Sequence, residues 1–326
     1  MNQKKNFKWG IIGCGKIAHK FAEDLMTIQN AILYAVASRD LKKAKDFGKT
    51  YNVYSCYGSY SELVTNPEID IIYIATPHVF HLENTLMCLT HNKAVLCEKP
   101  FAMNIKQVEE MITVAKNNNT FLMEALWTYF LPHYKYALNI IQSKELGEIK
   151  SLKADFGFAS TYNPENRVFN KKLGGGSLLD VGIYPLFAAL TILGYPEEIE
   201  ANATFNEDGI DEKCSMLLFY KNDIQASLQS SITEKTNTEA IIELEKGTII
   251  INSRFHEPSS VTIIRNGISK LHEFTTNTNG YSFEAIHVQE MLEKGNIEST
   301  VMTFDKSLQL IHLLDTVRDK INLHYE

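Results

Sequence analysis

Two short stretches combine ionisable side chains in a way that could support chemistry. The stretch "AVLCEKP" contains Lys99, and "GGGSLLDVGIY" contains Asp180 and Tyr184. A lysine that is partly removed from water beside a cationic ligand should lose its proton more easily, and could then act as an acid–base group. Asp180 and Tyr184 are four residues apart, which predicts that they share one face of a helix. The pattern also allows a structural role, with Asp180 complementing the helix dipole and Tyr184 hydrogen-bonded in the core.

A glycine-rich loop near the start of the chain indicates which ligand these residues could serve. The stretch "GIIGCGKIA" has a G-x-G-x-x-A pattern between a strand-like run and a helix-like run. Small residues there permit a tight turn and let a pyrophosphate approach backbone N–H groups, and the helix N-terminus attracts its charge. We therefore predict a dinucleotide site that includes Gly13, Gly15, Lys16 and Ile17.

The end of the next predicted strand reads Ser38-Arg39-Asp40. An NAD site usually has an acid at this point to bind the ribose 2′-hydroxyl. A hydroxyl followed by a guanidinium instead suits a 2′-phosphate, so we predict that Ser38 and Arg39 bind NADP, with NAD as the alternative cofactor. Asp40 is expected to cap the following helix, and Arg39 could also be a solvated loop residue.

Two further stretches fall at the carboxyl ends of predicted parallel strands, where ligands of open α/β sheets bind. They are "ATPHVFH" and "CEKP", and the side chains expected to face the cofactor are Thr76, Pro77, His78, His81, Glu98 and Lys99. The spacing of the two histidines fits a cap and a packed side chain better than a metal site, so no metal is expected.

The order of the predicted elements indicates two domains. Strand-like and helix-like runs alternate over residues 1–125, which predicts an α/β domain with a doubly wound parallel sheet of the Rossmann type. Residues 126–326 begin with a helix and continue mostly with short alternating runs separated by turn residues. This second part is predicted to be an α+β domain with an antiparallel meander.

Composition excludes several classes of function. A chain of 326 residues with 44% hydrophobic content can bury two cores. A net charge of -7 argues against nucleic acid as a partner. The five cysteines are irregularly spaced, which fits a reduced, cytoplasmic protein. The opening "MNQKKNFKWG" is not followed by the apolar run of an export signal. The apolar stretch "SLLDVGIYPLFAALTILG" contains Asp180 and Pro185, so we expect a buried helix and not a membrane span.

Five stretches together resemble the Gfo/Idh/MocA family of glucose-fructose oxidoreductase and inositol dehydrogenase relatives. They are "GIIGCGKIA", "ATPHVFH", "AVLCEKP", "MEALWT" and "GGGSLLDVGIY", in matching order along the whole chain. The resemblance implies an N-terminal Rossmann domain and a C-terminal domain with a large, open, mainly antiparallel sheet that binds substrate and mediates oligomerisation. It also implies NAD(P)-dependent oxidation or reduction of a sugar, cyclitol or related alcohol, with Lys99, Asp180 and Tyr184 in the catalytic positions. This chain has Tyr184 where the family more commonly has histidine. In this it resembles the branch that contains dimeric dihydrodiol dehydrogenase and NADP-dependent D-xylose dehydrogenase.

The resemblance also implies further contacts. Trp127 is expected near both cofactor and substrate, although relatives often have arginine where this chain has Tyr129. The loop "TYNPENRVFNKK" lies where the family covers its active site, so Arg167 is expected to touch substrate or a cofactor phosphate, or else to be an exposed loop residue. The expected substrate contacts are Lys99, Trp127, Arg167, Asp180 and Tyr184.

The sequence therefore predicts hydride transfer between nicotinamide and a hydroxyl or carbonyl carbon of a sugar, polyol or trans-dihydrodiol. Lys99 and Tyr184 would handle the hydroxyl proton, and Asp180 would orient them. The alternatives are an NADPH-dependent keto-sugar reductase and a non-catalytic dinucleotide- or sugar-sensing protein. An open sheet needs a cover for its outer face, so we expect a homodimer or a dimer of dimers.

Overall fold

A computed structural model describes residues 5–325, which form two compact units. Of the described residues, the first unit contains 5–127 and 276–308, and the second contains 128–275 and 309–325. Each unit is therefore built from segments that are not continuous in the sequence. The opening residues, on which the expectation about export depends, lie partly outside the described residues, and the division of the sequence at residues 125 and 126 stays a prediction.

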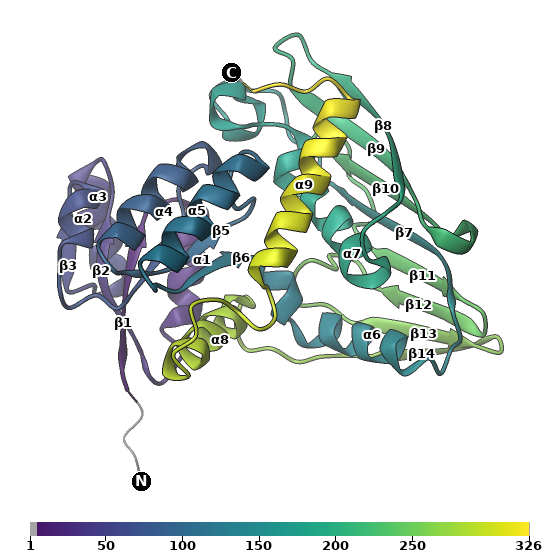
Figure 1. Ribbon diagram of the computed structural model, residues 1–326, viewed down its shortest axis with the longest axis horizontal. Coiled ribbons are helices and arrows are strands. Elements are labelled where there is room, and N and C mark those ends of the chain that lie inside the picture. The colour runs from purple at the N-terminus through teal and green to yellow at the C-terminus, as the bar shows by residue number, and fades with distance from the viewer. Residues whose placement is uncertain (1–4, 326) are drawn as a thin grey trace. The chain divides into compact units, whose positions relative to one another are not determined.

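The first unit contains a parallel sheet with strand order β3-β2-β1-β4-β5-β6 (Figure 1). Its strands are β1 (Phe7–Ile12), β2 (Ala31–Ala37), β3 (Ser55–Tyr57), β4 (Ile71–Ile74), β5 (Ala94–Glu98) and β6 (Leu122–Ala125). Every residue of β4, β5 and β6 is buried, as expected for strands covered on both faces. The order reverses between β1 and β4, where ligands of doubly wound sheets bind. The predicted Rossmann-type fold is confirmed.

Helices alternate with these strands: α1 (Lys16–Leu25), α2 (Leu41–Tyr51), α3 (Tyr60–Val64), α4 (His81–Thr90) and α5 (Ile105–Asn117). The returning segment adds α8 (Tyr281–Glu293), which packs against α1. Buried Asp24 of α1 accepts hydrogen bonds from the backbone N–H groups of Asn279 at 2.7 Å and Ser282 at 3.1 Å. Because these groups lie at the start of α8, the carboxylate of Asp24 caps a helix more than two hundred residues along the chain.

The second unit contains an eight-stranded sheet in the order β14-β13-β12-β11-β7-β10-β9-β8. Its strands are β7 (Ile149–Gly157), β8 (Glu198–Phe205), β9 (Asp211–Phe219), β10 (Gln225–Ser231), β11 (Ala240–Leu244), β12 (Gly247–Ile251), β13 (Val261–Arg265) and β14 (Ile268–His272). Only the pairing of β7 with β10 is parallel among these strands, so the predicted mainly antiparallel sheet is confirmed.

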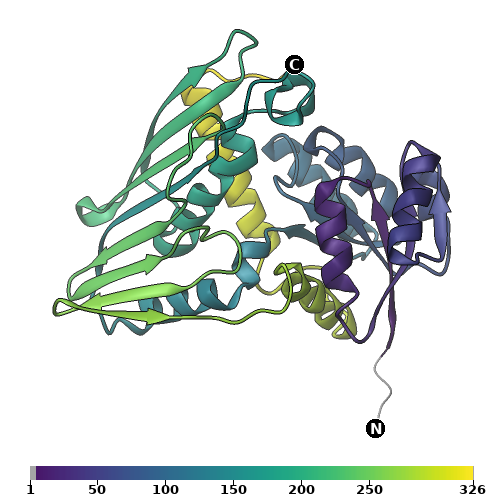
Figure 2. The ribbon, with the colours of Figure 1, turned by 180° about the vertical axis from the view of Figure 1, so that it is seen from behind.

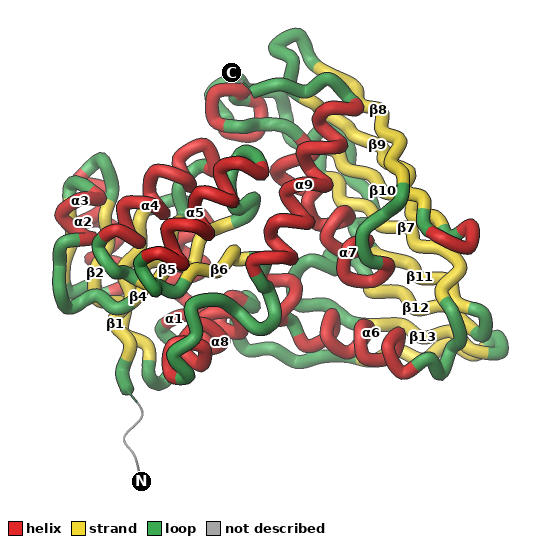
Figure 3. Tube along the Cα trace, in the orientation of Figure 1, coloured by secondary structure: helices red, strands yellow, loops and turns green. Residues whose placement is uncertain are grey.

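The two faces of this sheet differ in burial. Leu152 lies opposite Ala226 and Ile242 in a cross-strand row that is buried. Figures 1 and 2 show α6 (Pro132–Ser143) and α7 (Ile183–Leu193) on one face of the sheet, and α7 packs against β7 and β10. The helix α9 (Phe304–Lys320) follows α8 (Figure 3).

The segment Lys171–Leu193 is long and apolar enough to cross a membrane, but 78% of its most apolar window is buried inside the protein. It is therefore a core helix, as predicted. Its start differs from the expectation, because residues Leu178–Gly182 form a π-helical turn before α7 begins. Asp180 lies in the π turn and Tyr184 in the first turn of α7, so their four-residue spacing does not follow the geometry of one continuous α-helix.

Candidate active site

The glycine-rich loop of the first unit is shaped by backbone constraints. Gly13 has φ +97°, and a Cβ there would lie 2.8 Å from the carbonyl oxygen of Ala75, so only glycine fits without strain. Gly15 is the N-cap of α1, and no other atom lies within 4 Å of the place its Cβ would take. The first N–H groups of α1, those of Lys16 and Ile17, lack intrahelical acceptors and so could hold a phosphate, as predicted for these residues.

The residues predicted to select NADP lie at the end of β2. Ser38 is buried, and its Oγ accepts a hydrogen bond from the backbone N–H of Asp40 at 3.3 Å. The carboxylate of Asp40 accepts from the N–H of Lys42 at 2.9 Å, which confirms that it caps α2. The exposed guanidinium of Arg39 lies 5.2 Å from the ring centroid of Phe80, a cation–π distance that restricts where it can point.

His81 joins the ends of two strands. Its Nδ1 lies 2.9 Å from the carbonyl oxygen of Pro100, and its Nε2 lies 2.9 Å from that of Thr76. The side chain is buried, and burial lowers the pKa of His81 to about 4 despite these two acceptors. The neutral imidazole has one N–H and so donates a hydrogen bond to only one of these two carbonyl oxygens at a time, while its ring packs between the segment after β4 and the segment after β5. His78 is also buried, with its ring centroid 6.3 Å from that of His81.

Lys99 follows β5 and is anchored through its neighbour. One carboxylate oxygen of buried Glu98 accepts a hydrogen bond from the hydroxyl of Tyr73, and the other accepts from the backbone N–H of Lys99 at 3.2 Å. The Lys99–Pro100 peptide bond is cis. Glu98 thus fixes the backbone from which the Lys99 side chain projects.

The turn after Lys99 has a second anchor on β6. The backbone N–H of Phe101 donates to Oε1 of Glu124 at 3.0 Å. Burial is the main cause that raises the pKa of Glu124 to about 7.

Trp127, also buried, stacks on Tyr281 of α8 with 4.2 Å between ring centroids. The predicted cofactor residue Trp127 is therefore held by an aromatic contact within the first unit.

In the second unit, the structure brings Arg167 and Asp180 together. The Nη2 atom of Arg167 lies 2.6 Å from Oδ1 of Asp180, and the two side chains are 35% and 13% exposed. A short, charge-assisted contact of this kind fixes the direction of the carboxylate. The sequence predicted a substrate or phosphate contact for Arg167 and did not identify Asp180 as its partner.

Tyr184 lies among aromatic rings. Its ring centroid is 5.6 Å from that of Phe156 and 4.9 Å from that of His256, and Tyr184 is only 6% exposed. His256 was not singled out in the sequence, because it lies in a loop after β12 without any recognisable motif. Tyr129, where relatives often have arginine, packs edge-on against Phe187 of α7 at 5.2 Å.

Comparison with known proteins agrees with this geometry. Residues 7–126 match a family model described as an oxidoreductase family with an NAD-binding Rossmann fold, and residues 134–250 match the GFO/IDH/MocA C-terminal domain. The trans-1,2-dihydrobenzene-1,2-diol dehydrogenase of Xenopus tropicalis is 37% identical over 98% of this chain and 99% of the relative. The chain belongs to the GFO/IDH/MocA oxidoreductase family. It is an NAD(P)-dependent oxidoreductase, as the sequence predicted.

Solved structures share the fold of this GFO/IDH/MocA oxidoreductase. A 3-ketoreductase from Actinomadura kijaniata, in complex with NADP and TDP-benzene, superposes with a TM-score of 0.89 at 24% identity, covering 97% of this chain and 98% of that one. An aldose-aldose oxidoreductase from Caulobacter crescentus gives a TM-score of 0.89 at 23% identity and covers 98% of each chain. At this identity the likeness is one of fold.

The predicted site residues of this GFO/IDH/MocA oxidoreductase are divided between the two units. The first unit contains Gly13, Gly15, Lys16, Ile17, Ser38, Arg39, Thr76, Pro77, His78, His81, Glu98, Lys99 and Trp127. The second contains Arg167, Asp180 and Tyr184. Each predicted site residue therefore belongs to one unit or the other, and joint action of Lys99 with Tyr184 stays a prediction.

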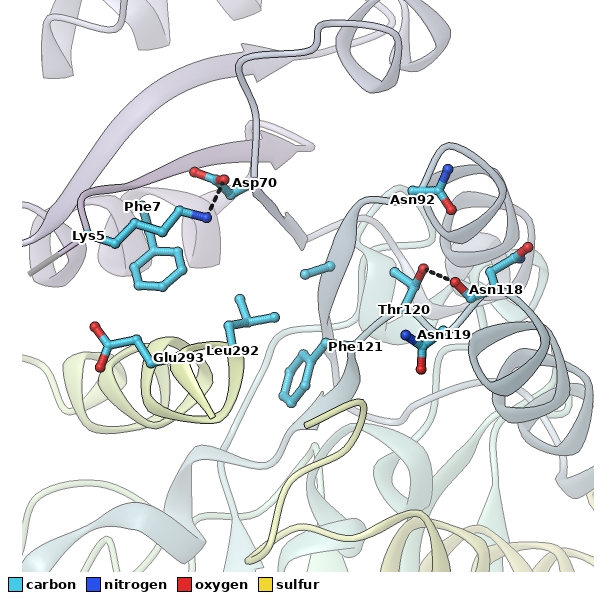
Figure 4. Close-up of a pocket in the computed structure, with 11 residues that line it drawn as sticks. Lys5, Phe7, Asp70, Asn92, Asn118, Asn119, Thr120, Phe121, Leu292 and Glu293 are labelled. Atoms are coloured by element: carbon cyan, nitrogen blue, oxygen red, sulfur yellow. Dashed lines mark hydrogen bonds and ion pairs between the residues drawn. The ribbon is translucent and has the colours of Figure 1, made fainter. Parts of the chain in front are cut away.

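One cavity of the oxidoreductase lies away from these residues. Its lining includes Phe7, Ala94 and Phe121, which begin or directly precede β1, β5 and β6 (Figure 4). Lys5 at its rim pairs with Asp70 at 3.1 Å. The cavity therefore lies at the amino ends of the strands, whereas the glycine loop, Arg39 and Lys99 follow the carboxyl ends.

Proposed function

We propose that the protein is an NADP-dependent dehydrogenase that acts on a hydroxyl group of a small sugar, polyol or trans-dihydrodiol. The observation that carries this proposal is the ion pair between Arg167 and Asp180 in the π turn that directly precedes α7, the helix that contains Tyr184. It occurs in a chain that also presents Lys99 directly after β5 and is 37% identical to a trans-dihydrodiol dehydrogenase.

The residues of the first unit fit a bound NADP. The N-terminus of α1 would hold the pyrophosphate, since Gly15 leaves room there. Ser38 and Arg39 would hold the 2′-phosphate through a hydroxyl and a planar guanidinium. Bound NADP supplies the acceptor for the substrate hydride.

The chain's own residues would handle the proton. In the oxidation direction the neutral Lys99 amine or the Tyr184 phenolate would accept the proton of the reacting hydroxyl, and in the reduction direction the Lys99 ammonium or the Tyr184 hydroxyl would donate it back. Asp180, whose carboxylate is held by Arg167, would orient these polar groups. The same groups serve an NADPH-dependent keto-sugar reductase, which is the second candidate. The non-catalytic alternative is disfavoured, because Lys99, Asp180 and Tyr184 are all present.

A substrate panel tests this proposal. Sugars, inositols and trans-dihydrodiols are incubated with NADP and, in parallel, with NAD, while keto-sugars are incubated with NADPH, and nicotinamide absorbance is followed. We expect turnover with at least one diol or polyol, and loss of turnover in Lys99→Met but not in a control at the exposed Lys106→Met. Absence of any hydride transfer across the panel, with a folded protein that binds NADP, would refute the catalytic proposal.

We also propose that the outer face of the eight-stranded sheet is covered by a second copy of the chain. The row that contains Lys153 includes the half-buried Ile241 and Ile250 and the exposed Leu271. Such apolar side chains favour association. Sedimentation should give a dimer or a dimer of dimers, and a single 37.0 kDa species at micromolar concentration would contradict this.

A cytoplasmic location, suggested by the irregularly spaced cysteines, is tested by cell fractionation.

A further inference from the structure

A buried carboxyl group lies against the turn that carries Asp180. Asp211, the first residue of β9, is fully buried. Its Oδ2 accepts hydrogen bonds from the backbone N–H of Leu178 at 2.7 Å and from the hydroxyl of Ser177 at 2.9 Å. The two donors lie three and two residues before Asp180 in the chain, so Asp211 binds the entrance of the π turn.

Further contacts hold the same entrance. The Ser177 hydroxyl also lies 3.0 Å from that of Ser230 at the end of β10, so the turn is attached to two strands. Gly176 has φ +130°, and a Cβ there would lie 1.9 Å from Oδ1 of Asp211. Only glycine therefore allows the carboxyl group to approach this closely. The hydroxyl of Tyr325 donates to the carbonyl oxygen of Gly175 at 2.8 Å.

The buried environment of Asp211 disfavours the charged carboxylate, whereas the hydrogen bonds from Leu178 and Ser177 favour it. Burial raises the pKa of Asp211 to about 7, while the hydrogen bonds from Leu178 and Ser177 oppose the shift. The N–H of Leu178 belongs to the first turn of a helical segment, where such groups lack intrahelical acceptors. Oδ2 of Asp211 and the two donors of the turn thus satisfy each other inside the core, whereas Oδ1 has no hydrogen-bond partner among the described residues.

We propose that Asp211 is a positioning residue for the proton step: it fixes the start of the π turn and thereby holds Asp180 where Arg167 can bind it, two residues beyond Leu178. This inference rests on the proposed function, because it assumes that Asp180 and Tyr184 act on the substrate. It identifies a residue that has no role in binding the substrate and no place in the motifs of the sequence.

The test combines kinetics with hydrogen–deuterium exchange on the segment 174–184. In Asp211→Ala we expect kcat to fall about 10- to 100-fold with an unchanged Kd for NADP, since a small displacement of a supporting residue costs about that much. Asp211→Asn keeps an oxygen acceptor for the Leu178 N–H and should recover much of the loss. Exchange should accelerate in Asp211→Ala. The control is Asp155→Asn, whose carboxylate accepts from the N–H of Thr238 at 2.7 Å on the same sheet and should change neither readout.

The outcomes separate the two proposals. A kcat within twofold of the wild type in folded Asp211→Ala, or unchanged exchange, would overturn the positioning role. If Asp211→Ala does not fold, Ser177→Ala replaces it, with an expected fall in kcat of several-fold and faster exchange at Leu178. If the wild type itself transfers no hydride, the proposed function fails, and the exchange result alone decides whether Asp211 holds the turn.

Discussion

The clearest test of cofactor selection is the removal of the Arg39 guanidinium. Arg39 lies in the position where an NAD site has an acid, and it is exposed with its charge against the Phe80 ring. A hydrogen bond to a charged group contributes about 1.5 to 3 kcal/mol, and an exposed contact belongs at the lower end of that range. Because about 1.4 kcal/mol corresponds to a tenfold change, Arg39→Ala should weaken NADP binding about 10- to 30-fold. NAD binding should change less than twofold.

Further variants separate the contributions of the charge, of the planar guanidinium and of the Phe80 ring to NADP affinity. Arg39→Lys keeps the charge without the planar fork, so it should lose about half of the free energy of the NADP preference. Phe80→Leu removes the ring beside the guanidinium and should weaken NADP about two- to fivefold, the size of an exposed cation–π contact. Lys42→Ala is the control. Lys42 is an exposed cation in the first turn of α2, three residues after Arg39, and it pairs with Asp46 at 2.8 Å.

Titration calorimetry with each cofactor in turn measures these changes. The decisive quantity is the ratio of the NADP and NAD dissociation constants in Arg39→Ala compared with the wild type. If both cofactors weaken equally, Arg39 does not bind the 2′-phosphate. If Lys42→Ala lowers NADP affinity as much as Arg39→Ala, the preference arises from general positive charge and not from Arg39.

Three other predictions follow from the site and the core. Lys99→Met and Tyr184→Phe should each lower single-turnover hydride transfer, by about 10²- to 10⁴-fold for the lysine, and the double variant should lose less than the product of the two if they act together. Arg167→Met should lower kcat more than it changes the Kd for NADP, since its charge is paired within the second unit, and a selective loss of NADP affinity would contradict this. The folded-state pKa of Glu124, about 7, lies above its ordinary value of 4.5, so its proton stabilises the fold fully below pH 4.5 and this stabilisation is lost as pH rises through 7. Glu124→Gln should therefore remove up to about 3 kcal/mol of the pH dependence of unfolding over that range, measured by urea denaturation, whereas the exposed Glu109→Gln should not.

Local patterns predicted the parts of the fold that depend on local structure. The strand-loop-helix pattern around Gly13, the cap formed by Asp40 and the buried helix after Gly176 all depend on neighbouring residues, and all are present. The alternating runs of the second part likewise predicted its mainly antiparallel sheet. Each of these features is determined by periodicity or by one residue's conformational preference.

Contacts between distant segments could not be predicted in the same way. The pairing of Arg167 with Asp180 depends on how a loop folds back over a helix start. The entrance of the π turn donates hydrogen bonds to Asp211, which lies on a strand later in the chain. Nothing in the stretch around Asp211 indicates those partners, because the carboxyl group acquires them only when β9 lies beside the turn.

The parallel pairing of β7 with β10 has a consequence for the order in which the protein folds. Parallel neighbours cannot be joined by a hairpin, so the chain crosses over between them, and this crossover contains the π turn and α7. Because Ser151 pairs with Gln225, the chain between them must close into a long loop. This closure costs conformational entropy before the stabilising contacts between the two strands form. Hairpins such as β11 with β12 close over a few residues and can form first. We therefore expect the segment that carries Asp180 and Tyr184 to be among the last parts of the second unit to order, and in a nascent chain these two residues would not reach their native positions until β10 has been synthesised.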